Sequence, residues 1–318
     1  MLLAPPVRPL WHTARGELRL DRAAVVGVLN LTPDSFWSGS RAAGVDAGLA
    51  RAGRMLEDGA SLLDVGGEST RPGAAAITAD AEIERVVPVV RAIARAFPDA
   101  RISVDTTKRV VARAALEAGA AAINDVSALR LDPELAHVVA SHDAGLVLMH
   151  SRGTVETMAS YALAAYGPDP VAEIVAELRA ALDAARAAGV ADECIVLDPG
   201  LGFAKRTEHS VAALAQLDRI LTLGRPVMIG PSRKRFIGEL TRGLPVEQRL
   251  EGTIAACVAG YLRGARLFRV HDVAPVRRAL DIAEAVSGTD RERKREGERE
   301  TDREGERADY TGRAGRVP

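Results

Sequence analysis

Short apolar runs alternate along the chain with longer alanine-rich stretches in which apolar residues recur every three or four positions. The short runs predict β-strands and the longer stretches predict α-helices. The predicted strands are Val25–Leu29, Leu62–Val65, Ile102–Val104, Ala121–Ile123, Leu146–Met149, Ile195–Leu197, Val227–Ile229 and Leu267–Val270. The predicted helices are Ala47–Asp58, Ala79–Ala96, Lys108–Ala118, Pro133–His142, Val171–Ala188, Val211–Leu221, Glu247–Arg263 and Val273–Val286.

This alternation predicts a single (β/α)8 barrel, with an active site at the C-terminal ends of the strands. Short strands that are apolar throughout are typical of a parallel sheet covered by helices, and eight strands close such a sheet into a barrel. An open sheet of the flavodoxin or Rossmann type is the alternative. It requires a glycine fingerprint after the first strand, where this chain has Asn30–Asp34 instead.

Two segments lie outside the barrel pattern. In residues 1–24, Leu10–His12 and Glu17–Leu20 predict a small hairpin that caps the bottom of the barrel. Residues 288–318 carry nine basic and nine acidic residues and almost no large apolar ones. Such a segment cannot bury enough surface to offset the entropy of ordering it. We therefore expect a barrel domain over residues 25–287, followed by a disordered charged tail.

The composition argues against proteins that bind nucleic acids or membrane surfaces. An apolar fraction of 47% is ample for one large core, and the net charge is −1. Proteins that bind nucleic acid or membrane surfaces normally carry a basic excess, and aromatic residues make up only 3% of this chain. The two cysteines, Cys194 and Cys257, lie far apart and fit a reducing compartment. No apolar run is long enough for a membrane span. We expect a soluble, cytoplasmic protein that acts on small molecules.

Each predicted strand ends in, or leads within a few residues to, a group that donates, accepts or carries charge. In a barrel these strand ends converge on one face, so the residues predict a shared site there. In chain order they are Asn30, Asp64 with Glu68, Asp105, Asn124, His150, Asp198, Ser232 with Lys234, and Arg269 with His271.

The mixture of residue types indicates the ligand chemistry. Carboxylates and an amide, from Asp64, Asp105, Asn124 and Asp198, suit a flat heterocycle rich in N–H donors. The cations Arg71, Arg233, Lys234, Arg269 and His271 suit a phosphate or diphosphate. No cluster has the spacing of a metal cage made by protein alone, but Mg²⁺ held by phosphate oxygens and one amide such as Asn30 is compatible.

Lysine is rare in this chain and its placement is uneven. Of 42 basic residues only four are lysines, and Lys108, Lys205 and Lys234 follow the third, sixth and seventh predicted strands. The fourth, Lys294, lies in the tail. The glycine-rich segment Gly200–Lys205 lacks the Gly-Lys-Ser/Thr sequence of a nucleotide phosphate loop, so it is interpreted as a turn that lets the backbone approach a ligand.

In order along the chain, these motifs resemble those of the dihydropteroate synthases, the folate-pathway enzymes inhibited by sulfonamides. The resemblance covers about residues 25–286. The matching segments are Gly27–Phe36, Asp64–Gly73, Ser103–Thr106, Ile123–Asp125, Leu148–His150, Leu197–Gly200 with Gly202–Phe203, Ser232–Lys234 and Arg269–Asp272. The first loop departs from the family pattern at Trp37, and the sequence leaves open how that loop closes.

The resemblance implies a homodimeric (β/α)8 transferase that uses Mg²⁺. It would join 4-aminobenzoate to (7,8-dihydropterin-6-yl)methyl diphosphate, giving 7,8-dihydropteroate and diphosphate. The implied pterin-binding residues are Asp64, Asp105, Asn124, Met149, Asp198, Phe203 and Lys234. The implied diphosphate ligands are Asn30, Thr70, Arg269 and His271, with Asn30 at the metal. The implied aminobenzoate site is Phe36, Arg71, Pro72 and Ser232. The loops Thr32–Gly44 and Glu68–Ala76 are expected to close over the substrates.

The expected mechanism is dissociative, with Asp105, Asp198, Lys234, Arg269 and His271 as the residues closest to the chemistry. Three alternatives stay open from the residues alone. A methyltransferase domain that presents methyl-tetrahydrofolate to a corrinoid protein would have no reason to keep Ser69–Gly73 and Ser232–Lys234. A Schiff-base aldolase would use Lys234 as nucleophile, and a non-catalytic paralogue would bind pterin without turnover.

Overall fold

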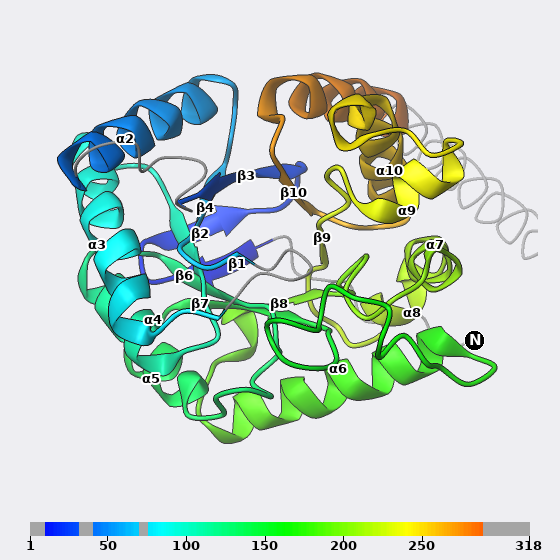
Figure 1. The fold of residues 1–318 in the computed structure, drawn as a ribbon, viewed down its shortest axis with the longest axis horizontal. Helices are drawn as coiled ribbons and strands as arrows, with labels where there is room; N and C mark the ends of the chain where they lie inside the picture. Colours follow the sequence, from blue (N-terminus) through cyan, green and yellow to red (C-terminus); the bar gives the residue numbers. More distant parts are fainter. Residues whose placement is uncertain (1–9, 32–40, 70–75, 289–318) are drawn as a thin grey trace, which may run out of the picture.

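The computed structural model describes residues 10–31, 41–69 and 76–288. Within them an eight-stranded parallel sheet has the order β8-β7-β6-β5-β4-β3-β10-β9. A further parallel bridge joins Leu197 of β8 to Val227, the residue before β9, so the two edge strands also meet. Figure 1 shows the helices as a ring around these strands. The predicted (β/α)8 barrel is confirmed.

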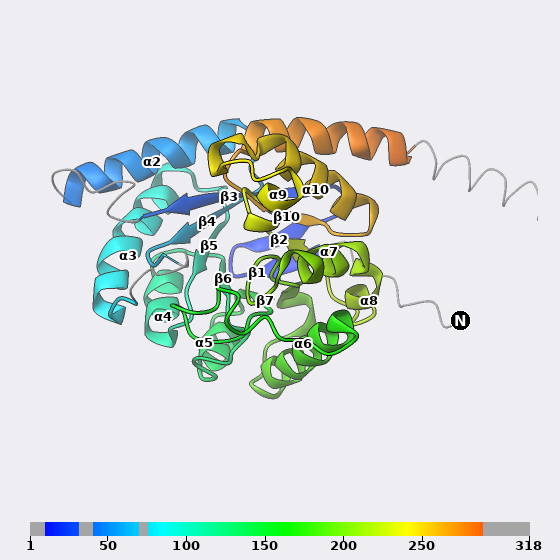
Figure 2. The same cartoon turned by 45° about the vertical axis from the view of Figure 1, so that its right-hand side comes forward.

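The strands are short, and most carry only four or five residues. Their bounds are β3 (Ala24–Asn30), β4 (Leu62–Gly66), β5 (Ile102–Asp105), β6 (Ala122–Asp125), β7 (Gly145–Met149), β8 (Ile195–Asp198), β9 (Met228–Ile229) and β10 (Leu267–Val270). The surrounding helices are α2 (Arg41–Glu57), α3 (Ala79–Ala96), α4 (Arg109–Glu117), α5 (Leu135–Ser141), α6 (Pro170–Ala187), α7 (Thr207–Ala215), α8 (Leu217–Leu221), α9 (Arg235–Leu240) and α10 (Leu250–Leu262). A last helix runs over residues 273–288, and Figure 2 shows it beside α2.

The structure corrects the predicted helices at three places. The helix predicted over Val211–Leu221 is two helices, α7 and α8, because Gln216 has non-helical dihedral angles. The helix predicted from Glu247 starts as a 3-10 turn, η2 (Val246–Gln248), before α10. The six-residue helix α9 was not predicted at all. Periodicity detects neither a break of one residue nor a helix of less than two turns.

The first described segment is a hairpin at the N-terminal end of the barrel. Strands β1 (Leu10–Thr13) and β2 (Gly16–Arg19) pair antiparallel. Trp11 is completely buried, and its indole N–H donates to the carbonyl of Cys194, 2.7 Å away, before β8. A Cβ added at Gly145 would lie 2.7 Å from the Trp11 ring, so β7 begins with the residue that leaves room for it. Trp11 thus fills the end of the barrel opposite the strand ends.

Among the described residues, no helix combines the length and apolar character that crossing a bilayer requires.

We expect Trp11→Ala to lower the free energy of unfolding by about 4 kcal/mol, because it leaves a large cavity in a closed core. Urea denaturation monitored by circular dichroism measures this loss. Val246→Ala, at a half-exposed position of η2, is the control and should change stability by less than about 0.5 kcal/mol. Equal stability of Trp11→Ala and the parent would show that the hairpin does not seal the core.

Candidate functional site

The inward-facing positions of the barrel change from apolar to polar along the strands. Apolar residues of seven strands form one cluster with Trp11 and Leu18, and six of them are Val26, Leu62, Ala122, Val147, Val196 and Leu267. Side chains two residues apart share a face of a strand. The next inward positions are therefore Val28, Asp64, Asn124, Met149, Asp198 and Arg269. The same alternation that fills the bottom of the barrel places a polar layer above it.

Arg269 joins two carboxylates in that layer. Its Nε donates to Asp64 at 2.6 Å and one terminal nitrogen donates to Asp105 at 2.7 Å. Asp64 also accepts from Ser103 Oγ at 2.6 Å and from Asn124 Nδ2 at 3.2 Å. Four strands, β4, β5, β6 and β10, thus contribute to one bonded cluster. Sequence reasoning named four of its members but missed Ser103, although its position in β5 two residues before Asp105 is a usable signal.

Burial raises the pKa values of two carboxyl groups in the site. The pKa of Asp105 is raised to about 7, because desolvation outweighs the attraction of Arg269. The pKa of Asp198 is raised to about 6 by burial, against the Gly200 N–H that donates to it at 2.7 Å. A cation or an N–H donor that enters the site would stabilise the ionised forms of both carboxyl groups and lower their pKa values.

Asn124 has an unsatisfied acceptor. Its amide nitrogen donates to Asp64, but its buried Oδ1 has no hydrogen-bond partner among the described residues. Leaving a buried acceptor unpaired costs about 1–3 kcal/mol. A ligand with an N–H group would supply the missing donor.

An apolar wall lies beside the polar layer. Met149 and Phe203 pack with Val126, Val155 and Met158 in one buried cluster. The Lys234 ammonium lies 3.7 Å from the centre of the Phe203 ring. Burial and the charge of Arg269 lower the pKa of Lys234 to about 7. Lys234 is the residue immediately before α9.

Ser232 and His271 form a second polar pair. The Ser232 hydroxyl accepts from the His271 backbone N–H at 3.2 Å and lies 2.9 Å from His271 Nδ1. When the Ser232 hydroxyl donates its hydrogen to Nδ1, the proton of the neutral imidazole lies on Nε2. Burial and the charge of Arg269 lower the pKa of His271 to about 4, so the ring is neutral near pH 7. Arg233 is paired with Asp272 at 2.6 Å.

Asn30 ends β3 beside this cluster. A Cβ added at Gly66 would lie 3.6 Å from Asn30 Oδ1 and 3.6 Å from Asp105 Cβ, so the two side chains flank Gly66. In the part of the chain that the structure covers, no three His, Cys, Asp or Glu residues are grouped as metal ligands. One amide oxygen fits Mg²⁺ only if ligand oxygens and water complete the coordination, which is how this hard ion is usually held with phosphates.

Several predicted site residues fall outside the described ranges: Phe36, Thr70, Arg71 and Pro72, together with Trp37 and most of the two loops expected to close. Of the lysines, Lys108 is bonded away from the barrel interior. It pairs with Glu68 at 2.9 Å and with the fully buried Glu82 at 2.6 Å. Glu68 also accepts from the Ile77 backbone N–H at 2.7 Å. Lys108 therefore supports the base of the segment after β4.

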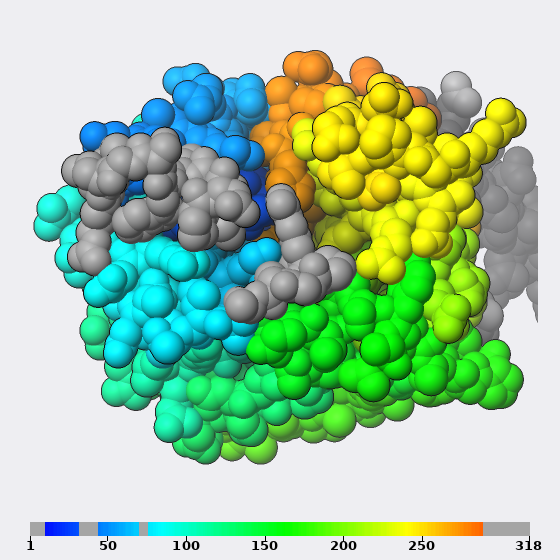
Figure 3. Space-filling model, viewed as in Figure 1, coloured from blue at the N-terminus to red at the C-terminus, as the bar shows by residue number. Residues whose placement is uncertain are grey.

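The rim of the site is closed on one side by contacts between two loops. Figure 3 shows the segment after β7, in green, against the segment around α9, in yellow. Tyr161 donates to Glu239 of α9 at 2.9 Å, and the Arg235 guanidinium lies 4.4 Å from the centre of the Tyr161 ring. These contacts position the helix that follows Lys234.

Comparison with known proteins agrees with this geometry. Residues 26–271 match the family model described as pterin binding enzyme. The dihydropteroate synthase of Synechocystis is 41% identical over 285 residues, which are 89% of this chain and 96% of that protein.

Solved structures give the same result. Dihydropteroate synthase from Xanthomonas albilineans with 4-aminobenzoic acid is 44% identical, with a TM-score of 0.81 over 88% of this chain and 98% of that one. The same enzyme in complex with 7,8-dihydropteroate is 41% identical, with a TM-score of 0.75 over 85% and 96%. The chain belongs to the dihydropteroate synthases, transferases of the pterin-binding enzyme family.

Proposed function

We propose that the polar layer of the barrel binds the pterin ring of (7,8-dihydropterin-6-yl)methyl diphosphate and that this chain joins it to 4-aminobenzoate. The observation that carries the proposal is the buried, unpaired Oδ1 of Asn124 beside Asp64 and Asp105. A dihydropterin presents several N–H donors in one plane, and carboxylate and amide acceptors match such an edge. Asp198 completes the set of acceptors.

The apolar wall would bind the faces of the same ring. Met149 and Phe203 offer a sulfur atom and an aromatic face, which suit a flat heterocycle. Lys234 lies against Phe203 and would donate to a pterin acceptor. The pterin would then be bound by edge and by face at once, which fixes the direction of its diphosphate arm.

The diphosphate would lie over Arg269, His271 and Asn30, with Thr70 as a further donor. Two nitrogens of Arg269 are used by Asp64 and Asp105, which leaves its other terminal nitrogen for a phosphate oxygen. His271 is neutral, so it would donate a hydrogen bond from Nε2 rather than contribute a full charge. Mg²⁺ bound to the diphosphate and to Asn30 would supply the remaining positive charge.

The aminobenzoate site would be formed by Ser232 together with Phe36, Arg71 and Pro72, the last three of which lie outside the described residues. Ser232 is hydrogen-bonded to His271, so the aminobenzoate and diphosphate sites would adjoin at this pair. The neutral aryl amine is already a nucleophile and needs no strong base. Its lone pair would form the new C–N bond, and one of its protons would then be released.

We propose that bond breaking comes first. The C–O bond breaks with its electron pair leaving on diphosphate, and the pterin delocalises the positive charge left on the methylene carbon. Ionised Asp105 and Asp198 would stabilise that charge electrostatically without bonding to it. Family membership also supports a homodimer, a cytoplasmic location and the role of a sulfonamide target. The barrel is proposed to span residues 25–287, and the predicted charged tail lies outside the described residues from residue 289 onward.

Diphosphate release by the purified protein tests the proposed reaction. With the pterin diphosphate, Mg²⁺ and 4-aminobenzoate together, we expect diphosphate and 7,8-dihydropteroate in equal amounts. Leaving out the pterin, the metal or the amine in turn should abolish dihydropteroate formation. Tight pterin binding without turnover in the complete mixture would contradict the proposal and favour the non-catalytic paralogue.

A secondary deuterium isotope effect at the reacting methylene tests the order of bond changes. Dissociative loss of diphosphate should give a large normal effect, because the methylene carbon becomes planar and loosely bonded. An effect near unity, accompanied by a large primary ¹³C effect, would indicate direct displacement by the amine and overturn the dissociative mechanism.

Lys234→Ala and Arg269→Ala should separate binding from turnover. We expect Lys234→Ala to raise the KM for the pterin about tenfold, a loss of about 1.4 kcal/mol of binding. Arg269→Ala should lower kcat on the order of 100-fold, because its charge matters most as diphosphate leaves.

Steady-state kinetics measures both changes, with thermal unfolding to confirm that each variant is folded. Arg186→Ala, which removes a surface arginine of α6, is the matched control and should leave both constants unchanged. Full activity of both site variants would show that the site assignment is wrong even though the fold is right.

A further inference from the structure

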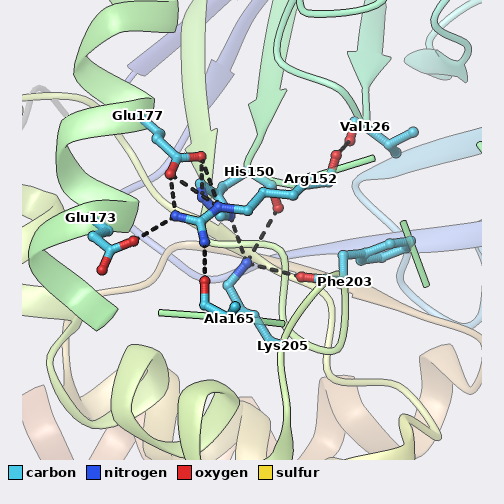
Figure 4. A network of polar contacts seen from close by, with 9 residues as sticks. Val126, His150, Arg152, Ala165, Glu173, Glu177, Phe203 and Lys205 are labelled. Atoms are coloured by element: carbon cyan, nitrogen blue, oxygen red, sulfur yellow. Dashed lines mark hydrogen bonds and ion pairs between the residues drawn. The ribbon is translucent and has the colours of Figure 1, made fainter. Parts of the chain in front are cut away.

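Lys205 is buried beside the apolar wall of the site, and a buried lysine requires contacts that compensate for the loss of water. Its side chain is only 1% exposed, and the proposed reaction does not use it. Its ammonium contacts three acceptors: His150 Nδ1 at 2.7 Å, the Phe203 carbonyl at 3.1 Å and the His150 carbonyl at 3.5 Å. Figure 4 shows it between the end of β7 and the backbone of Phe203. Three N–H donors therefore meet three acceptors, one of them in the residue whose ring lines the pocket.

The loop that carries Phe203 has a strained backbone. Gly200, Gly202 and Ala204 all have positive φ angles, of 64°, 78° and 45°. The left-handed region costs an alanine on the order of 1 kcal/mol, so surrounding contacts must hold this conformation. The loop also lies very close to β7, since a Cβ at Gly200 would be 1.9 Å from the His150 carbonyl. Lys205 bonds to the His150 carbonyl, which Gly200 approaches, and to the Phe203 carbonyl of the same loop.

The chain of contacts continues to the outer helix. Because Lys205 donates to Nδ1, the proton of neutral His150 lies on Nε2, which donates to Glu177 of α6 at 3.0 Å. Burial and the charge of Lys205 lower the pKa of His150 to about 4, which keeps the ring neutral near pH 7.

Arg152 binds Glu177, the outermost residue of this series of contacts (Figure 4). It pairs with Glu177 and, at 2.7 Å, with Glu173, and it donates to the Ala165 carbonyl at 2.5 Å. Helix α6 is thereby connected through Glu177, His150 and Lys205 to the backbone of Phe203.

The geometry explains why this Arg-rich chain has a lysine here. The three acceptors surround a single nitrogen, which an ammonium group matches. A guanidinium spreads its donors over a planar fork and needs more room than a 1% exposed site offers.

We propose that Lys205 is a positioning residue of the pterin pocket, which holds the Phe203 loop against β7 so that the Phe203 ring stays in place beside Lys234. This inference rests on the proposed pterin site. Lys205 does not touch the substrate in this role. Its effect on pterin binding is transmitted only through Phe203, so removing the Phe203 ring should also remove the effect of Lys205.

The first test is the kinetics of Lys205→Met, which keeps the length of the side chain and removes its donors. We expect the KM for the pterin diphosphate to rise five- to tenfold, while kcat and the KM for 4-aminobenzoate change less than twofold. Lys205→Arg keeps the charge but should show the same defect. A wild-type pterin KM in Lys205→Met, or full rescue by Lys205→Arg, would overturn the proposal.

A double-mutant cycle with Phe203→Ala separates positioning from general stability. Phe203→Ala alone should raise the pterin KM, and adding Lys205→Met to it should raise the KM by less than a further twofold. Additive effects would show that Lys205 does not act through Phe203. An unchanged pterin KM in Phe203→Ala would instead show that the pterin site itself is wrongly assigned.

Glu177→Leu provides a second test that does not depend on Lys205→Met folding. Glu177 is partly exposed and lies three contacts away from Phe203, so its replacement removes the acceptor for His150 without entering the pocket. We expect a two- to threefold rise in the pterin KM and no change in the KM for 4-aminobenzoate. An unchanged pterin KM in this variant would contradict the chain of contacts.

Discussion

The pairing of Arg269 with Asp64 and Asp105 is the interaction on which the site depends. Charges removed from water are tolerated only when partners and hydrogen bonds compensate them, and removing one partner of such a set costs about 3–5 kcal/mol. Here the guanidinium of β10 spans to β4 and β5, with distances of 2.6 and 2.7 Å. The strands can satisfy these charges only when the parallel order β5-β4-β3-β10 is formed, because β3 lies between β10 and β4. Folding and assembly of the site are therefore the same event.

The apolar wall of the site is built differently from its polar layer. The polar residues stand on strands, whose pleat fixes their direction. Phe203 stands on a loop with three left-handed residues, so contacts from outside must fix it. Lys205, His150 and Glu177 connect that loop to α6, on the outer layer of the barrel (Figure 4). A rigid strand needs no such support, which explains why a hydrogen-bonded network lies under this loop.

The predictions from sequence succeeded where the signal is local and long enough. All eight strands were found, and α3 has the predicted bounds, because its apolar stripe continues for eighteen residues from an N-cap at Thr78. The break at Gln216 and the short helix α9 were missed, since one residue or six leave little trace in a periodic pattern. Among the predicted site residues, the structure brings Asp64, Asp105, Asn124 and Arg269 into one bonded cluster. Ser103 was missed because the side chain of a serine within an apolar strand has no chemical signature, and only its position two residues before Asp105 indicates that it faces the site.

The sequence by itself determined the barrel, the strand ends as the site and, through a resemblance spread over the whole folded part, the pterin chemistry. Those properties depend on order along the chain, which the sequence contains directly. Only the tertiary structure decided which acceptors Arg269 and Lys205 bond to, that Asn124 Oδ1 has no partner among the described residues, and that His271 is neutral. Each of these depends on distances between residues far apart in the chain and on how much water burial removes, and no local pattern records either.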